Sequence, residues 1–546
     1  MVEPLKEPKI IQTMTSPFNG CSCVINKEYA KEMCTEIQDI VLERLENMDD
    51  DEMKDIDRTT ISNMLTEFKG FLCIGIDDED SVDQKLESVK LSMALRFLKS
   101  SNMKKRLNGI NQIKSIIEFT ERSSSSSDHM RRHWQDDDSP RVSRWLKPEY
   151  LCNWLLENQL LEYILGENSH VEVVKRSTSV LKFLSNCKAL TKDHLDLLWK
   201  CQEDKHEATV LGVYETINEV ALDLEKDALD YIFTKIESIP LKKYNEQTVN
   251  FVKEFTSNAC RVSRSSPAAN LVEVSSDDEE DKDIEFFVEN AKQIVSGEIE
   301  EPKKSVPEYG LPIIFKLLEQ SNDLGSTALK ALIEILRYKH LDMFKISYIL
   351  KSIKNLQDGK YVHQSLTIIT SILPKCFNSK DYESSSQSHV AIMKLNEHFD
   401  FIKLTIKNIE RYNEVVQSKM VGLVNKGTIP ENIPKTCFEG NILHSDHLEK
   451  LLEFIEFSSI YTGGEITIGQ ENIEKLWNLF VNTSGIEFDK NLFLKWMNKE
   501  RFTKGNIQTI NQRRIFTSDE REYIFNSILC QSDQVDKKEI TYNCFK

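Results

Sequence analysis

The sequence predicts an all-α protein. It contains only 18 glycines and 13 prolines in 546 residues, about half the average share, so the turns that β-rich proteins need are scarce. Between Trp145 and Cys260, apolar residues recur at helical spacing in blocks that begin about every 20 residues. Similar periodicity covers 90–119, 311–377 and the stretch from 390 onward. These observations favour helices throughout.

The first block predicts one helix over Leu151–Ile164, which Gly166 ends. The next helix is predicted to start at Ser169, because Ser169 and Glu172 form an S-x-x-E capping box. In such a box the hydroxyl and the carboxylate reciprocally satisfy free backbone N–H groups. The apolar face of this helix comprises Val171, Val174, Leu181 and Leu184.

Four further helices follow in this region. Thr191 is the expected N-cap of the first, and an apolar stripe over Glu207–Leu222 predicts the second. A short helix is expected at Leu229–Ile236, and Asn245 is the expected cap of one over Val249–Phe255. If these helices share one core, the buried side chains should include Trp154, Val174, Leu181, Leu198, Trp199, Val213 and Ile217.

Six helices of about 10 to 18 residues with short connections are typical of an armadillo or HEAT-like α-solenoid, whose unit is two or three helices in about 40 to 47 residues. No repeat consensus is visible, so an irregular helical bundle stays open as the alternative. Acidic and Ser-rich insertions of low apolar content, which we expect to be disordered, interrupt the helices. The expected organisation is an N-terminal helical segment, partly flexible (1–90), helical repeats (91–260, with a disordered loop at 122–144), an acidic disordered linker (261–283) and further helical repeats (284–546, with a loop at 378–389).

The formal net charge of −18 repels phosphates and anionic lipids, so neither nucleic acid nor membrane is an expected partner. No stretch approaches 18 consecutive apolar residues, and Met1–Ser16 lacks the apolar core of a signal peptide. The twelve cysteines contain no CxxC pair, which suits free thiols in a reducing compartment. We expect a cytoplasmic protein, with the nucleus as a second location.

Motifs for catalysis and for metal or cofactor binding are missing from the sequence. It has no Gly-rich phosphate loop, GxSxG or HExxH. One Cys/His group (Cys437, His444 and His447) and one Cys group (Cys21, Cys23 and Cys34) lack four ligands at zinc-finger spacing. His206 precedes a predicted helix, where capping or packing is the expected role. We therefore predict no catalytic residue, no metal ligand and no cofactor.

Four segments carry a resemblance to a known family: Arg144–Tyr150, Leu161–Gly166, His194–Trp199 and Lys205–Ala208. They resemble the N-terminal armadillo-like region of very large ubiquitin-specific proteases of the fat facets type. The similarity is most specific over Leu91–Cys260, continues at Tyr309–Phe377, and is weaker at Lys475–Trp477 and Phe493–Trp496. It implies a helical-repeat scaffold.

Members of that family are cysteine-type deubiquitinases whose Cys-His-Asp/Asn site lies in a separate domain after this scaffold. Their cysteine box has a Gly-Asn-Thr-Cys core, whereas Pro434–Phe438 lacks the glycine before Thr436-Cys437, and no histidine box follows. We interpret Cys437 as unrelated to catalysis. The resemblance thus implies a non-catalytic region that binds substrates or regulators, from a fragment or shortened relative of a deubiquitinase. The alternative is an acidic HEAT-type transport receptor or adaptor for basic peptides.

One short segment resembles a SUMO-interacting motif. Leu271, Val272 and Val274 adjoin the acidic run Ser275–Asp281, so the apolar residues would add a strand to a partner's sheet while the acidic tail meets basic residues. Phosphorylation of Ser275 or Ser276 would add negative charge. A solvated linker is the alternative interpretation.

Overall fold

The structure is a computed structural model. It describes residues 79–125, 146–166, 169–203, 205–265, 286–301, 307–318, 324–338, 341–376, 384–424, 442–462, 465–484, 486–497 and 518–524, together with the single residues 26, 28, 38, 43, 69, 72, 73 and 526.

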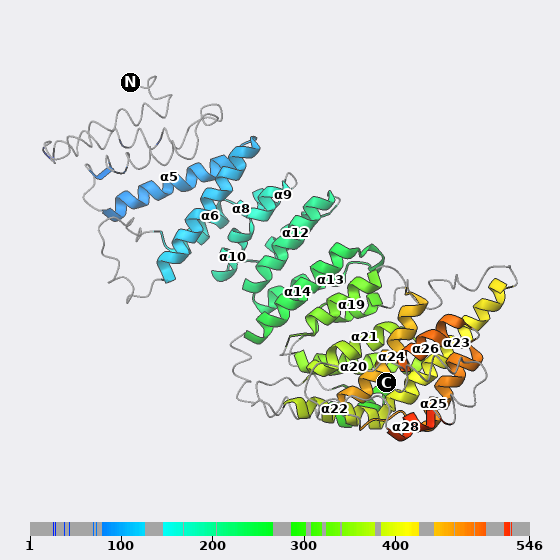
Figure 1. The fold of residues 1–546 in the computed structure, drawn as a ribbon. Coiled ribbons are helices and arrows are strands. Elements are labelled where there is room, and N and C mark those ends of the chain that lie inside the picture. Colours follow the sequence, from blue (N-terminus) through cyan, green and yellow to red (C-terminus); the bar gives the residue numbers. More distant parts are fainter. Residues whose placement is uncertain are drawn as a thin grey trace. The chain divides into compact units, whose positions relative to one another are not determined.

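Every regular element in these residues is a helix and none is a strand (Figure 1). The chain divides into two compact units, Met1–Lys235 and Ile236–Lys546. The predicted all-α class is therefore confirmed. No described helix is long and apolar enough to cross a membrane.

Unit 1 begins with two long helices, α5 and α6, and continues with shorter ones. α5 packs on α6, α7 and α11 pack on α8, and α9 and α10 each pack on both α6 and α12. The helices are α5 (Glu79–Lys99), α6 (Met103–Ser125), α7 (Pro148–Glu157), α8 (Leu160–Leu165), α9 (Val171–Arg176), α10 (Thr178–Asn186), α11 (Lys192–Lys200), α12 (Glu207–Val220), the 3₁₀ turn η2 (Ala221–Asp223) and α13 (Lys226–Glu237), which crosses the division between units.

Gly109 sets how closely α5 and α6 approach. A Cβ atom at this position would lie 2.4 Å from Leu98 N and 2.6 Å from Ala94 O, both backbone atoms of α5. Only glycine lets the two backbones pack at this distance. Ile110 and Ile113, on the same helix, are fully buried.

The predicted single helix over 151–164 is wrong, because two helices occupy this stretch. Gln159 adopts a left-handed conformation with φ 50°. Asn158 Nδ2 donates to Trp154 O at 2.8 Å and thereby takes one of the last carbonyls of α7. Because neither residue is Gly or Pro, the apolar pattern alone concealed the break.

Three of the four predicted N-caps are confirmed. Thr191 Oγ1 accepts from His194 N, His206 Nδ1 accepts from Ala208 N at 3.2 Å, and Asn245 Oδ1 accepts from Thr248 N at 2.8 Å. The capping box at Ser169 is wrong. His170 is the cap of α9 instead, and Glu172 pairs with an arginine on its own helix rather than reaching back.

Five of the seven expected core residues are buried: Val174, Leu181, Leu198, Val213 and Ile217. Trp154 and Trp199 are only half-buried, so the expectation is wrong for the two tryptophans. Each lies at the edge of an apolar stripe, where a large ring is covered on one side. The smaller aliphatic residues fill the centre.

Unit 2 has longer helices. Neighbouring pairs such as α18–α19, α20–α21 and α23–α24 pack together, and α14 also packs on α19. Its elements are η3 (Leu241–Lys243), α14 (Glu246–Ser265), α17 (Ala291–Ser296), α18 (Leu311–Leu318), α19 (Leu324–Ile335), α20 (Asp342–Asp358), α21 (Val362–Ile372), η5 (Leu373–Lys375), α22 (Ser384–Phe399), α23 (Phe401–Val424), α24 (His444–Tyr461), α25 (Gln470–Trp477), the π-helical η6 (Asn478–Thr483), α26 (Glu487–Met497) and α28 (Ser518–Tyr523).

Several helices extend past the expected boundaries. α6 continues to Ser125, inside the expected loop 122–144, and α14 continues to Ser265, inside the expected linker 261–283. α22 begins at Ser384 and α5 runs across residue 90. Serine is tolerated in terminal helical turns, so composition marks such ends only approximately. The remaining parts of the two expected insertions, 126–144 and 266–283, lie outside the described residues.

Candidate interaction surface

Several contacts between helical elements of unit 1 join residues at similar sequence separations. Four such hydrogen bonds join residues 35 to 42 positions apart: Tyr231–Asp196, Cys201–Leu165, Ser185–Asp223 and Thr216–Val174. This separation is close to the 40 to 47 residues of an armadillo or HEAT unit. The structure thus supplies the repeat that no consensus revealed.

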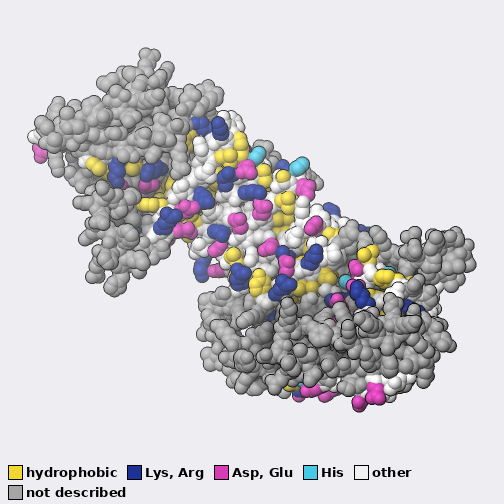
Figure 2. All heavy atoms as spheres, in the orientation of Figure 1, with side chains coloured by type: hydrophobic (Ala, Val, Ile, Leu, Met, Phe, Trp, Pro, Cys, Tyr) yellow, Lys and Arg dark blue, Asp and Glu magenta, His cyan; other side chains and the backbone are white. Residues whose placement is uncertain are grey.

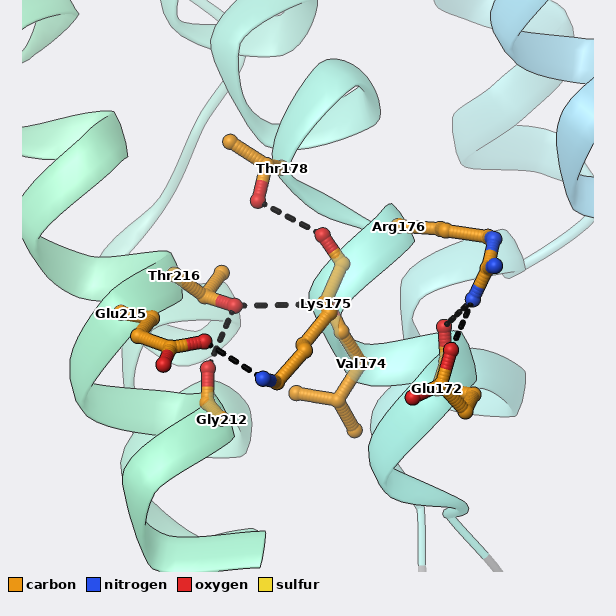
Figure 3. Close-up of polar contacts among 8 residues, drawn as sticks. All are labelled: Glu172, Val174, Lys175, Arg176, Thr178, Gly212, Glu215 and Thr216. Carbon is orange, nitrogen blue, oxygen red and sulfur yellow. Dashed lines mark hydrogen bonds and ion pairs between the residues drawn. The ribbon is translucent and has the colours of Figure 1, made fainter. Parts of the chain in front are cut away.

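Figure 3 shows the contact between α9 and α12, which includes the Thr216–Val174 hydrogen bond. Lys175 Nζ lies 2.7 Å from Glu215 Oε2. Thr216 Oγ1 lies 2.8 Å from Gly212 O and 3.5 Å from Val174 O. Glu215 raises the pKa of Lys175 by hydrogen bonding to its ammonium group. The two helices are therefore joined by an exposed ion pair and by a buried polar contact.

Gly212 allows this close approach. A Cβ atom there would lie 2.9 Å from Val171 Cγ2 and 3.4 Å from Lys175 Cε. In addition, Thr178 Oγ1 donates to Lys175 O at 2.9 Å and so connects α9 with α10 (Figure 3). Within α9, Arg176 NH1 lies 2.6 Å from Glu172 Oε2.

Ion pairs continue along the unit. Lys182 pairs with Asp223 at 3.3 Å, Lys188 with Glu225 at 3.3 Å, and Lys235 with Asp196 at 2.8 Å. The hydrogen bond from Lys235, and after it one from Tyr231, lowers the pKa of Asp196. The first and third pairs join different helical elements, and the second joins the segments that follow α10 and precede α13. Figure 2 shows side chains of both signs interspersed over this surface. Such a surface is polar and locally neutral.

A groove opens between α6, α7 and α10, with a cavity volume of about 480 Å³. Phe183, Pro148 and Cys187 provide apolar lining, and Glu118 and Glu121 provide carboxylates. Arg122 and Asn186 complete the lining. The lining thus combines apolar and charged side chains. Sequence periodicity did not indicate this groove, because its residues come from helices far apart in the chain.

The thiols near this groove are not activated for catalysis. Burial raises the pKa of Cys187 to about 11, and burial also raises the pKa of Cys152. A nucleophilic cysteine needs the opposite shift, because the thiolate is the reactive form. In unit 2, burial raises the pKa of Cys260 to about 12. These cysteines act as small apolar residues.

The histidines of the predicted Cys/His group lie in a buried polar cluster of unit 2. His444 Nε2 lies 2.7 Å from Asp489 Oδ1, and His444 Nδ1 lies 2.7 Å from the Tyr412 hydroxyl. His447 packs against the ring of Tyr412. The cluster is enclosed by α23, α24 and α26, so it serves packing. No group of metal-ligating residues occurs in the part of the chain that the structure describes.

The remaining predicted residues fall elsewhere. Cys437 and the segment with Leu271, Val272, Val274, Ser275 and Ser276 lie outside the described residues. Their predicted roles remain predictions.

The helical sequence of this chain matches a known family of armadillo repeats. The family model described as UBP24/USP9X/USP9Y ARM repeat matches residues 84–250 and 314–546. The chain belongs to this family. The expected armadillo-like scaffold is thereby confirmed, and the comparison does not favour the alternative of an acidic transport receptor. An armadillo-repeat region of this kind supports protein–protein interaction in general.

Individual relatives agree with this membership. The chain is 23% identical to ubiquitin carboxyl-terminal hydrolase 9X of Mus musculus over 514 residues, which cover 90% of this chain and 18% of the relative. It is 20% identical to the probable ubiquitin carboxyl-terminal hydrolase FAF of Drosophila melanogaster over 510 residues, covering 90% and 16%. It is 19% identical to ubiquitin carboxyl-terminal hydrolase 24 of Homo sapiens over 533 residues, covering 93% and 18%. The chain therefore spans less than a fifth of the length of these relatives.

Proposed function

We propose that this chain is a non-catalytic protein-interaction scaffold, which holds substrates or regulators of the ubiquitin pathway for a deubiquitinase. The observation that carries the proposal is the family match, which spans most of the helices of both units. Stacked helical repeats present an extended surface, and each repeat contacts mainly its neighbours. Such a surface can bind long segments of other proteins.

The groove between α6, α7 and α10 is the proposed anchor point. Its floor includes the ring of Phe183, which is almost fully buried, and its rim carries Glu118 and Glu121. Buried anchors that fill a pocket contribute most of the binding energy of protein interfaces. A partner would insert one side chain with an apolar body into this groove.

Affinity capture followed by quantitative mass spectrometry tests the proposal. The tagged full chain should enrich ubiquitin-conjugated proteins over a helical-repeat control of similar size. Asn186→Trp, at an exposed position on the groove, should reduce the captured set severalfold because the indole would fill the cavity. Asn153→Trp is the matched control, since Asn153 is exposed on α7 and does not line the groove. Equal capture by the full chain and the unrelated control would contradict the scaffold.

A catalytic assay tests the non-catalytic part of the proposal. We expect no turnover of a ubiquitin C-terminal reporter and no labelling by an electrophilic ubiquitin probe. Thiols with raised pKa values, such as Cys187 and Cys260, support this expectation. Turnover that Cys437→Ala abolishes would refute it.

SUMO is a proposed additional partner through Leu271, Val272 and Val274. The sequence pattern of an apolar strand followed by acidic residues supports the proposal. A peptide spanning residues 270–283 should bind SUMO with micromolar to tens of micromolar affinity, and phosphorylation of Ser275 or Ser276 should strengthen it. Replacing both valines by alanine should abolish binding. Equally weak binding by the unmodified peptide and the double-alanine peptide would mean that the segment is only a linker.

A further inference from the structure

A long basic stretch stands out in this acidic chain. Residues 88–117 contain seven Lys and Arg residues and no Asp or Glu, whereas the whole chain has a net charge of −18. Such local asymmetry of charge is a signal for an interaction site rather than for a fold. The stretch covers the end of α5, the turn that follows it and most of α6.

Four of these cations gather where α5 meets α6. Lys99 is the last residue of α5, and Lys104, Lys105 and Arg106 occupy the first turn of α6. We call these four residues the basic turn. Acidic residues are favoured in a first helical turn because the N-terminus of a helix carries partial positive charge, and α6 has none there. Lys104, Lys105 and Arg106 oppose the dipole of α6, which costs stability unless an anion is bound nearby, whereas Lys99 complements the C-terminus of α5.

Aromatic rings hold two of the cations in place. Lys105 Nζ lies 5.1 Å from the centre of the Phe97 ring, and the Arg106 guanidinium carbon lies 5.8 Å from the centre of the Tyr163 ring. Arg106 Nε is buried and has no hydrogen-bond partner. The side chain of Arg106 is therefore positioned, while part of its hydrogen-bonding capacity is unused.

The other two cations face solvent. Lys99 and Lys104 are exposed, and neither forms an ion pair with any residue that the structure describes. By contrast, Lys175 and Lys182 of the same unit each pair with a carboxylate of another helical element, and Lys188 pairs with Glu225 between two segments that connect helices. Within the described residues, Lys99 and Lys104, the exposed half of the basic turn, thus lack the carboxylate partner that other lysines of this unit have.

The turn is held firmly. Asn102 Oδ1 accepts from Lys104 N at 2.9 Å and caps α6, and Ser100 Oγ accepts from Asn102 N at 3.2 Å. The close backbone contact at Gly109 fixes α6 against α5 two turns further on. A site whose cations are held in advance loses less entropy when a ligand binds.

We propose that the basic turn is a docking site for an acidic segment of a partner protein, bearing either a run of carboxylates or a phosphoserine. This proposal rests on the proposed function, in that it names the partner chemistry of one place on the scaffold. A helix N-terminus attracts anions through its dipole and its backbone N–H groups. The guanidinium group of arginine binds a carboxylate or a phosphate through two parallel hydrogen bonds. The strongly acidic remainder of the chain repels long polyanions, so a short acidic peptide fits better than nucleic acid or membrane.

Fluorescence anisotropy with the full chain tests the site. The probes are a fluorescein-labelled eight-residue peptide of alternating Asp and Glu, the same peptide with one phosphoserine, and a version with Asn and Gln. We expect micromolar binding of the two anionic peptides, weakening at high salt, and no binding of the neutral one. The two anionic arms decide whether carboxylates suffice or phosphate is preferred.

Paired charge reversals provide the control. The double variant Lys99→Glu/Lys104→Glu should weaken binding at least about tenfold, which corresponds to about 1.4 kcal/mol. Lys200→Glu/Lys226→Glu changes the net charge by the same amount at two exposed lysines elsewhere in unit 1. This control variant should weaken peptide binding less than about twofold. Both positions of each pair are exposed, and unchanged melting temperatures would show that the fold is intact.

Three results would overturn the docking site. These are undetectable binding of both anionic peptides, equal loss in the two double variants, and tighter binding to phosphatidylserine vesicles or single-stranded DNA than to the peptides. Capture of ubiquitin-conjugated proteins is measured separately, so loss of the peptide site with intact capture would reject the basic turn alone. Lost capture with intact peptide binding would reject the ubiquitin-pathway role alone.

Discussion

His444 and Asp489 form a buried pair in unit 2, with Nε2 and Oδ1 2.7 Å apart and side chains only 7% and 1% exposed. The carboxylate accepts a hydrogen bond from Nε2, and Nδ1 on the other side of the ring lies 2.7 Å from the Tyr412 hydroxyl. Asp489 Oδ2 accepts from Ser484 Oγ at 2.5 Å. This chain of hydrogen bonds connects α23, α24 and α26, three helices that are separated in the sequence.

Removing the carboxylate should destabilise unit 2 strongly. Asp489→Ala leaves the buried His444 donor and the partly buried Ser484 hydroxyl without an acceptor, and we expect a loss of about 3 kcal/mol in the free energy of unfolding. Ser484→Ala removes one hydrogen bond and should cost about 1 kcal/mol. Urea unfolding monitored by circular dichroism measures both. Similar small losses for the two variants would mean that the network does not hold the three helices together.

Unit 2 should lose stability as pH falls below about 6.5, the ordinary pKa of histidine. Burial, and then the charges of His363 and His444, lower the pKa of His447 to about 3, and burial also lowers that of His363. At pH values between about 3 and about 6.5, His447 binds a proton in the unfolded chain but not in the folded chain. Folding therefore becomes less favourable as pH decreases through this range. Above pH 6.5 these two histidines contribute no pH dependence.

The slope for His447 should approach about 1.4 kcal/mol per pH unit over that range. His447→Phe should flatten the profile of the urea midpoint against pH, since it keeps a ring against Tyr412 without a titrating group. Thr467→Phe is the control, because it adds the same ring at an exposed position of unit 2 that has no titrating group, and it should leave the profile unchanged. An unchanged profile in His447→Phe would contradict the assignment.

Gly109→Ala should destabilise unit 1 by about 1 to 3 kcal/mol or more, because the new methyl group would overlap the backbone of α5. Gly297→Ala is an informative comparison. Gly297 has φ +82° and open space around its Cβ position, so only the cost of a left-handed alanine, about 1 kcal/mol, is expected. Melting temperatures of the two variants give the order, and a larger loss at Gly297 would argue against close packing of α5 on α6.

Two neighbouring residues of α11 should differ in their contribution to stability. Leu198 is 1% exposed, so Leu198→Ala should cost about 2 to 5 kcal/mol. Trp199 is half-buried, and Trp199→Ala should cost less than a core tryptophan because part of its ring already contacts water. Chemical denaturation of both variants tests the order. A greater loss for Trp199→Ala would place the tryptophan in the core after all.

Local signals in the sequence predicted local structure well. Thr191, His206 and Asn245 were identified as helix starts, because a capping side chain acts on backbone only two or three residues away. The break at Gln159 was missed, since a left-handed glutamine carries no residue-type signal. Half-burial of Trp199 was missed for a related reason, because periodicity gives the direction of a side chain but not how far its neighbours cover it.

Contacts between distant residues were outside the reach of sequence reasoning. His444 and Asp489 lie 45 positions apart, and the groove lined by Glu121 and Phe183 combines three helices. Neither arrangement follows from spacing along the chain. The family resemblance was visible in short segments, and a helical-repeat scaffold followed from it, but the places on the scaffold that bind partners required the folded structure.

The similar sequence separations of these contacts in unit 1 have a consequence for how the protein is made. Hydrogen bonds that join residues 35 to 42 positions apart close small loops, and small loops are fast to form. Each helix group of this unit can dock on the preceding one soon after it leaves the ribosome, before the rest of the chain exists. Synthesis from the N-terminus would then assemble the repeats in order. The apolar surface of each repeat would be covered by a nearby helix and would not stay exposed until a distant segment is made.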